Sequence, residues 1–337
     1  MKTAAILGPR EAGLADVPDP KPVEDLVLVK VHVAPMCTEY KTFIEGKPGD
    51  CHGHEAAGEV AALAQPGRVD AGQRVVVMPQ YPCGRCALCL QGEYIHCQHN
   101  RDIAKRTGSK AGTATMAQYL LKPDWLLIPI PGGVSYEHAS MACCALGPSF
   151  GACERMRVGA MDTLLVTGLG PVGLGAVVNG RHRGARVIGI ESNPYRAKLA
   201  RELGAEVLDP GAKDLAEQLR ARTDGRGADA AIDCAGVPSA QLLCLEALRR
   251  RGQLCFVAQS GELTVPVSKL ILQKGLSLHG QWHYNLGDAP KLMRMIQDCG
   301  AALDKLITHT FPMSKIQEAW EVQASGQCGK VLLKPWS

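Results

Sequence analysis

Four cysteines lie close together in the stretch YPCGRCALCLQGEYIHC, with the spacing C-x2-C-x2-C-x7-C. Thiolates are good zinc ligands, and four of them complete a tetrahedral shell that leaves no position for water or substrate. Gly84 and Gly92 allow the sharp turns that wrap such a loop around one ion. The spacing predicts a structural zinc site formed by Cys83, Cys86, Cys89 and Cys97. The alternatives are an iron–sulfur cluster, whose motifs overlap with this triplet, and four unrelated structural cysteines.

A second set of metal ligands is spread along the chain. Cys37 occurs in PMCTEY, His54 precedes Glu55 in CHGHEAAGEV, and Cys143 and Cys144 are adjacent in MACCALGPSF. Two thiolates and one imidazole leave the fourth zinc position open for water or an alcohol oxygen, which is the layout of a catalytic site. Each residue alone is typical of a core or surface position, so the prediction depends on their occurring together.

A glycine-rich turn indicates a dinucleotide site. It has the pattern G-x-G-x-x-G, and it lies between an apolar strand pattern at 164–167 and a helix. The glycines allow a tight turn and the close approach of a pyrophosphate, whose charge the helix N-terminus stabilises. A carboxylate at the end of the next strand, Glu191, binds ribose hydroxyls and repels a 2′-phosphate, which favours NAD over NADP. The candidate cofactor-binding residues are Gly168, Leu169, Gly170, Pro171, Val172, Gly173, Glu191 and Arg196. Arg196 is equally typical of a solvated helix face.

The elements around these motifs predict an α/β protein with two kinds of domain. After the turn, the strand patterns ADAAIDCAGV, GQLCFVAQ and LSLHGQW alternate with helical segments such as 239–250, which indicates a doubly wound parallel sheet. Residues 1–130 are proline-rich with short strand patterns (LVLVKVHV, RVVVMP, AQYLL), which indicates an irregular β-rich domain. The tail predicts a helix, a glycine turn and a strand that returns to it. The predicted boundaries are 1–145 with the four-cysteine stretch at 81–99, 146–283, and 284–337.

Composition and charge argue against some classes of binding partner. The net charge of +4 and the absence of a Lys/Arg-rich run argue against nucleic acid. The longest apolar run, at 164–178, is interrupted by glycines and does not predict a membrane span, and the N-terminal apolar run is too short for a signal peptide. We therefore expect a cytoplasmic protein. In a reducing compartment its fourteen cysteines do not predict a disulfide framework.

The sequence resembles the zinc-dependent alcohol and polyol dehydrogenases of the medium-chain dehydrogenase/reductase superfamily over essentially its whole length. The motif Gly53-His54-Glu55, the four-cysteine stretch and the glycine-rich turn carry the resemblance. It implies a GroES-like catalytic domain with a Rossmann domain, two Zn²⁺ ions per chain, NAD, and a homodimer or homotetramer. It also implies that Cys37, His54 and Cys144 hold a catalytic zinc with Glu55 behind them, because Cys144 lies at the family's distance from the turn. Cys143 is the second choice.

The chain departs from the family pattern after its first zinc ligand. Cys37-Thr38-Glu39 is one residue shorter than the usual motif, and Lys41 and Thr42 stand where a relay histidine sometimes occurs. The resemblance implies that the Thr38 hydroxyl relays the substrate proton and that Glu39 orients His54.

The expected function is a zinc-dependent oxidoreductase that transfers a hydride between a secondary alcohol, polyol or sugar hydroxyl and NAD. Polar aromatic residues at 282–284 suit a hydroxylated substrate or pack a domain junction equally well. One alternative is a non-catalytic zinc- and NAD-binding homologue, although such a protein would be free to lose Cys37 or His54. Another is an NADP-dependent aldehyde or ketone reductase of the same superfamily. A zinc-independent reductase is expected to lack both metal motifs.

Overall fold

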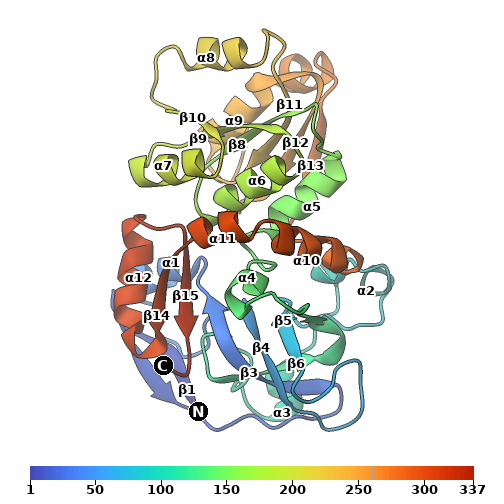
Figure 1. Ribbon diagram of the computed structural model, residues 1–337, viewed down its shortest axis with the longest axis vertical. Coiled ribbons are helices and arrows are strands. Elements are labelled where there is room, and N and C mark those ends of the chain that lie inside the picture. The colour runs from blue at the N-terminus through green and yellow to red at the C-terminus, as the bar shows by residue number, and fades with distance from the viewer. Residues whose placement is uncertain (260) are drawn as a thin grey trace. The chain divides into compact units, whose positions relative to one another are not determined.

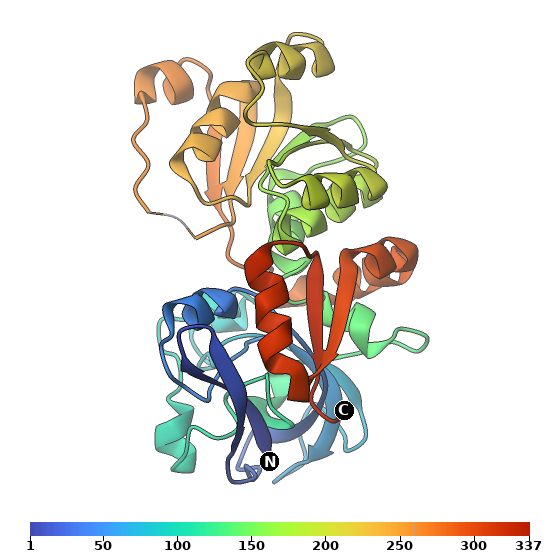
Figure 2. The ribbon, with the colours of Figure 1, turned by 90° about the vertical axis from the view of Figure 1, so that its left-hand side faces the viewer.

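The computed structural model describes residues 1–259 and 261–337, which divide into two compact units. The first unit contains Met1–Cys144 and Asn285–Ser337, and the second unit contains Ala145–Tyr284. Both ends of the chain therefore belong to the first unit, where Figure 2 shows them.

The first unit is β-rich. Within the described residues its main sheet has the strand order β14-β15-β3-β4-β5-β7, and β6 also pairs with β3 (Figure 1). A separate ribbon pairs β1 with β2. The strands are β1 (Lys2–Gly8), β2 (Glu11–Asp16), β3 (Leu26–Pro35), β4 (Ala56–Ala62), β5 (Arg74–Val77), β6 (Tyr119–Pro123), β7 (Leu127–Pro129), β14 (Ile307–Pro312) and β15 (Lys330–Lys334).

Short helices connect these strands. They are α1 (Glu39–Glu45), α2 (Ala87–Leu90), η1 (Tyr94–His96), α3 (Ile103–Thr107), η2 (Asp124–Leu126), α4 (Tyr136–Ser140), η4 (Leu286–Asp288), α10 (Ala289–Asp298), α11 (Gly300–Leu306), η5 (Met313–Lys315) and α12 (Ile316–Ser325). The predicted tail is confirmed, since α12 is followed by a left-handed Gly326 and then by β15. β15 pairs antiparallel with β3 and so returns the chain to the N-terminal strands. Helix α12 lies along the β1–β2 ribbon (Figure 2), where the Ala12 N–H donates to Gln317 at 2.7 Å.

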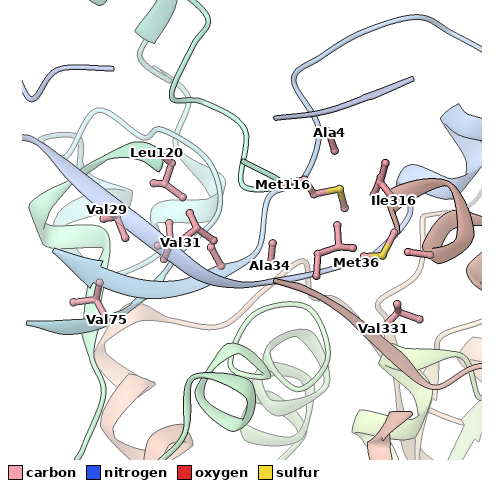
Figure 3. Close-up of a cluster of buried hydrophobic side chains, with 14 of the residues drawn as sticks. Ala4, Val29, Val31, Ala34, Met36, Val75, Met116, Leu120, Ile316 and Val331 are labelled. Atoms are coloured by element: carbon pink, nitrogen blue, oxygen red, sulfur yellow. The ribbon is translucent and has the colours of Figure 1, made fainter. Parts of the chain in front are cut away.

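Alternation along β3 explains how this unit forms a core. Val29 and Val31 are completely buried and lie with Val75 and Leu120 in one apolar cluster (Figure 3). Successive strand side chains point to opposite faces, so residues two apart share a face. The same cluster includes Ile316, so the C-terminal helix completes a core that the N-terminal strands begin.

The second unit is the predicted doubly wound parallel sheet. Its strands, in the described part of the chain, are ordered β10-β9-β8-β11-β12-β13, with parallel pairing throughout. The order reverses between β8 and β11, and ligands of such sheets bind outside the strand ends at this point. The strands are β8 (Thr163–Thr167), β9 (Arg186–Ile190), β10 (Glu206–Leu208), β11 (Ala228–Asp233), β12 (Leu248–Phe256) and β13 (Ser277–Gly280).

Helices pack on both faces of this sheet. Leu165 of β8 clusters with Leu219 and Leu245, whereas its neighbour Leu164 approaches Gly180 of the helix after the turn. A Cβ at Gly180 would collide with Leu164, so the glycine permits this close packing. The helices are α5 (Gly147–Met156), α6 (Pro171–His182), α7 (Pro194–Glu202), α8 (Leu215–Arg222), α9 (Pro238–Ala247) and η3 (Ser268–Leu272).

One predicted boundary is wrong. The helix expected over 239–250 ends at Ala247, and Leu248 begins β12. Leu248 pairs with Ala228, and the register then shifts before Ala230. The arginines that follow favour helix by propensity, but strand pairing and a 2.5 Å contact between Arg249 and Asp229 outweigh that preference.

In the described chain, helices of the length and hydropathy that a membrane crossing requires are absent.

Candidate functional site

Three predicted metal ligands come together beyond the ends of two central strands of the first unit's sheet. Cys37 follows β3, His54 precedes β4, and Cys144 follows α4. Their ligand atoms and a Glu55 oxygen all lie within 4.8 Å of one another. His54 Nε2 is 3.2 Å from Cys144 Sγ. A hydrogen bond between the two thiols lowers the pKa of Cys37 well below its usual value and raises the pKa of Cys144, and a hydrogen bond from His54 adds to the lowering at Cys37. This favours the Cys37 thiolate, the form that binds metals.

Glu39 connects two of these ligands. Its Oε1 is 2.8 Å from His54 Nδ1, and its Oε2 accepts the Cys37 N–H at 3.0 Å. A carboxylate on Nδ1 fixes the ring and leaves Nε2 directed at the metal position. Glu39 is therefore placed where it can orient His54.

Glu55 connects the third ligand to the C-terminal strand. Its Oε2 accepts the Cys144 N–H at 3.0 Å, and its Oε1 is 2.6 Å from Lys330 Nζ on β15. Burial alone would lower the pKa of Lys330, but the neighbouring Glu55 outweighs it and raises that pKa. Burial raises the pKa of Glu55 to about 7, and the Lys330 ammonium opposes that rise. At 2.6 Å and with both side chains buried, we interpret the contact as an ion pair behind the ligands.

The adjacent cysteines diverge. Cys143 is fully buried and its Sγ lies 3.5 Å from the Val77 carbonyl oxygen, so it is not in the ligand cluster.

Gly53, before His54, has a φ of +89°, and a Cβ there would collide with Thr115 and the Met116 backbone. A glycine is therefore required for the loop that presents His54.

Thr38 is the predicted residue that the geometry supports least. Its side chain is exposed, and it occupies the N-cap position of α1 without a side-chain cap hydrogen bond. Among the described residues its hydroxyl has no hydrogen-bond partner, so no relay beyond it is visible from these contacts.

The donor set of this cluster suits zinc. A tetrahedral ion with typical bond lengths separates sulfur and nitrogen ligands by about 3.5 Å. The 3.2 Å between His54 and Cys144 is close to this value. Two thiolates and an imidazole would hold the ion, and the fourth position would stay open to substrate.

The four-cysteine stretch forms a separate group. Helix α2 carries Cys89, and a short 3-10 turn precedes Cys97. The four Sγ atoms lie within 4.8 Å of one another, with separations of 4.0 Å (Cys83 to Cys89), 3.5 Å (Cys86 to Cys89) and 3.9 Å (Cys86 to Cys97). A tetrahedral zinc–thiolate site has edges of about 3.8 Å. The group therefore fits a structural zinc.

The glycine-rich turn joins β8 to α6. Gly168 has a φ of +76°, and Gly170 is the N-cap of a helix that begins with Pro171 and Val172. A Cβ at Gly173 would collide with the Gly168 carbonyl, while buried Leu169 packs against Gly189 of β9. The turn is thus a glycine-lined cradle at the helix N-terminus, where a pyrophosphate would be stabilised.

Two side chains flank this cradle. Glu191 follows β9, and its carboxylate accepts the Leu169 N–H at 2.7 Å and the Asn193 N–H at 2.8 Å. Arg196 Nε is buried and has no hydrogen-bond partner among residues 1–259 and 261–337. A terminal Arg196 nitrogen lies 3.8 Å from the position of a Cβ at Gly170. A buried donor left unpaired beside the cradle suits a ligand with acceptor oxygens.

Sequence reasoning missed two residues of these sites. Lys330 looks like an ordinary strand lysine, although the apolar residues that follow it in GKVLLK indicate a buried strand. Asp233 ends β11 and accepts hydrogen bonds from Thr167 and from the Ala235 and Gly236 N–H groups. Its position at a strand end beside the reversal of strand order was the available signal.

The aromatic residues at 282–284 differ in their burial. His283 and Tyr284 are buried, and Tyr284 packs edge-on against Phe150 within the second unit. Trp282 is 48% exposed. Burial favours a packing role for His283 and Tyr284 and leaves Trp282 as the accessible ring.

Comparison with known proteins agrees with this geometry. The alcohol dehydrogenase GroES-like domain family matches residues 23–132, and the zinc-binding dehydrogenase family matches residues 171–298. An uncharacterised zinc-type alcohol dehydrogenase-like protein of Escherichia coli is 30% identical, covering 99% of this chain and 98% of its own. Sorbitol dehydrogenase of Bacillus subtilis is 28% identical over 99% and 97% of the two chains.

A solved structure shares the whole fold. The alcohol dehydrogenase of Thermus sp. ATN1 superposes with a TM-score of 0.89 at 23% identity, with 99% of each chain covered. This chain has the same combination of a GroES-like unit and a Rossmann unit. The protein therefore belongs to the zinc-type alcohol dehydrogenase family of the medium-chain dehydrogenase/reductase superfamily.

Proposed function

We propose that the protein transfers a hydride between a secondary alcohol, or a hydroxyl of a polyol or sugar, and NAD, and that this transfer depends on zinc. The observation that carries the proposal is the ligand group of Cys37, His54 and Cys144. It supplies three donors, since both oxygens of the neighbouring Glu55 are bonded to Lys330 and to the Cys144 N–H, whereas the cysteine stretch supplies four thiols. One site is thus open for substrate and the other is closed.

The proposed reaction converts a secondary alcohol and NAD⁺ into a ketone, NADH and a proton. When bound, zinc supplies Lewis acidity that lowers the pKa of the substrate hydroxyl, and NAD accepts the hydride from the carbinol carbon. Cys37 and Cys144 would bind the ion as thiolates and would offset most of its charge. Glu39 orients the His54 ring, and Glu55 holds the Cys144 backbone in place.

The proton would leave through the Thr38 hydroxyl, which is the exposed hydroxyl next to Cys37. Water can accept it directly, because among the described residues no protein group is hydrogen-bonded to the exposed Thr38 hydroxyl. Replacing the hydroxyl should then slow proton release without affecting metal content.

Glu191 supports NAD as the cofactor. Its carboxylate lies beside the glycine cradle, where a 2′-phosphate would be repelled. Arg196 adds a cation at the same cradle, and we assign it to the adenosine ribose or the pyrophosphate. NADP is the less favoured cofactor because its 2′-phosphate would lie beside the negative charge of the Glu191 carboxylate.

The test is an NADH absorbance screen over secondary alcohols, polyols and sugars, with zinc content measured on the same samples. We expect activity with NAD in wild type, none in Cys144→Ser, and near-normal activity in the matched control Cys143→Ser. A protein that binds zinc and NAD but never forms NADH is a non-catalytic homologue. Oxidation of NADPH by aldehydes, with NAD inactive, identifies the alternative reductase.

A further inference from the structure

The four-cysteine stretch is hydrogen-bonded to the point where the chain re-enters the first unit. The second unit ends at Tyr284, and Asn285 is the first residue after it. Asn285 Nδ2 donates to the Gln91 carbonyl at 2.8 Å and to Glu93 Oε1 at 2.9 Å. The Leu286 N–H donates to the Gly92 carbonyl at 2.9 Å. Three bonds therefore join the segment Gln91–Glu93, between the last two cysteines, to the re-entering chain.

The Asn285 side chain has separable functions in this contact. Its amide nitrogen faces two oxygens, whereas its Oδ1 accepts the Gly287 N–H at 2.9 Å and caps η4. Each atom thus has the partner that its chemistry requires. Gly92 has a φ of +83°, and a Cβ there would overlap the Asn285 amide. The cysteine stretch is shaped to receive this side chain.

A pocket open to solvent lies on the other side of the re-entry point. Its volume is about 1020 Å³, and it is lined by Gly92, Asn285 and Leu286, with Leu90, Trp125 and Met293 around it. Leu90 is 75% exposed. Because side chains do not fill this volume, the hydrogen bonds to Gln91–Glu93 carry much of the constraint on the segment Asn285–Asp288.

We propose that Asn285 is a positioning residue through which the metal-filled cysteine stretch holds the chain where it returns from the second unit. The closed metal site would then control the order of Asn285–Asp288 although it contacts no substrate. This inference rests on the proposed function only in that zinc fills the cysteine stretch, and the coupling itself is independent of turnover.

The experiment is a double-mutant cycle read by hydrogen–deuterium exchange of peptides covering residues 285–288. Asn285→Asp keeps the oxygen that caps η4 but loses both donor bonds and adds a charge beside Glu93. We expect it to speed exchange at these amides at least tenfold while two zinc ions per chain remain bound. Cys89→Ser, which opens the metal site, should speed the same amides with Asn285 intact. The double variant should exchange within about twofold of Cys89→Ser, because one coupled contact has already been lost.

Asn100→Asp is the matched control. It adds the same charge three residues after Cys97 at an exposed position, and it should leave exchange at 285–288 unchanged. Gly92→Ala disturbs the same contact from the cysteine stretch, because the added Cβ would overlap the Asn285 amide. It should speed exchange at 285–288 as Asn285→Asp does.

The proposal would be overturned if the double variant speeds exchange at 285–288 by the product of the two single effects. Unchanged exchange in Asn285→Asp would also overturn it. Coupled exchange in a protein that transfers no hydride would instead refute the proposed function and leave this inference standing.

Discussion

Lys330→Met tests whether the buried ion pair behind the metal ligands holds the first unit together. Lys330 and Glu55 have side-chain exposures of 1% and 0%, and their charged atoms are 2.6 Å apart. Glu55 also accepts the Cys144 N–H. Removing one partner of a buried pair leaves an uncompensated charge and costs about 3–5 kcal/mol. The substitution preserves most of the volume, so the cavity contribution is small.

This free energy corresponds to a large thermal shift. For a unit of this size, about 2–4 °C per kcal/mol predicts a fall in Tm of roughly 6–20 °C for the unfolding transition of the first unit. Differential scanning calorimetry of zinc-replete protein measures it. The double variant Glu55→Gln with Lys330→Met removes both charges and keeps an oxygen for the Cys144 N–H, so it should recover part of the loss.

The matched control is Lys2→Met. Lys2 and Asp16 are also 2.6 Å apart, but their side chains are 49% and 77% exposed. Solvent screens such a pair, and no measurable change in Tm is expected. Equal shifts in Lys330→Met and Lys2→Met, or a double variant less stable than the sum of its singles, would refute the reasoning.

Three further predictions concern the metal and nucleotide sites. Cys89→Ser should lower zinc content towards one ion per chain and reduce Tm before turnover falls; a variant that keeps its Tm and both ions would exclude a structural zinc there. Glu191→Ala should narrow the preference for NAD over NADP in kcat/KM, and a wild-type preference for NADP would contradict the assignment. Cys144→Ser should abolish turnover and remove about one zinc ion, whereas Cys143→Ser keeps both; the reverse pattern would move the ligand to Cys143.

Local patterns predicted the fold well. The strand at 164–167 and its glycine turn appear as β8 and α6, since apolar runs and glycines act over a few residues. The helix end at Ala247 was not predictable in this way, because the pairing of Leu248 with Ala228 is a tertiary contact.

The candidate site was predictable where residues lie in a motif of known spacing or align with the family's motif. The contact between Glu39 and His54 followed from the register of the motif after Cys37. Lys330 was not predictable, because 275 residues separate it from Glu55. The exposure of Thr38 also depends on how α1 begins, which its residue type does not reveal.

The most direct test of the central claim is to follow the hydride itself. Zinc-replete protein is incubated with NAD and secondary alcohols or polyols that carry deuterium on the carbinol carbon, and the reduced cofactor is analysed by mass spectrometry. We expect one deuterium in each NADH formed, and none with Cys144→Ser at equal NAD binding. Unlabelled NADH, or equal labelling by the Cys144→Ser variant, would contradict zinc-dependent hydride transfer at the site of Cys37, His54 and Cys144.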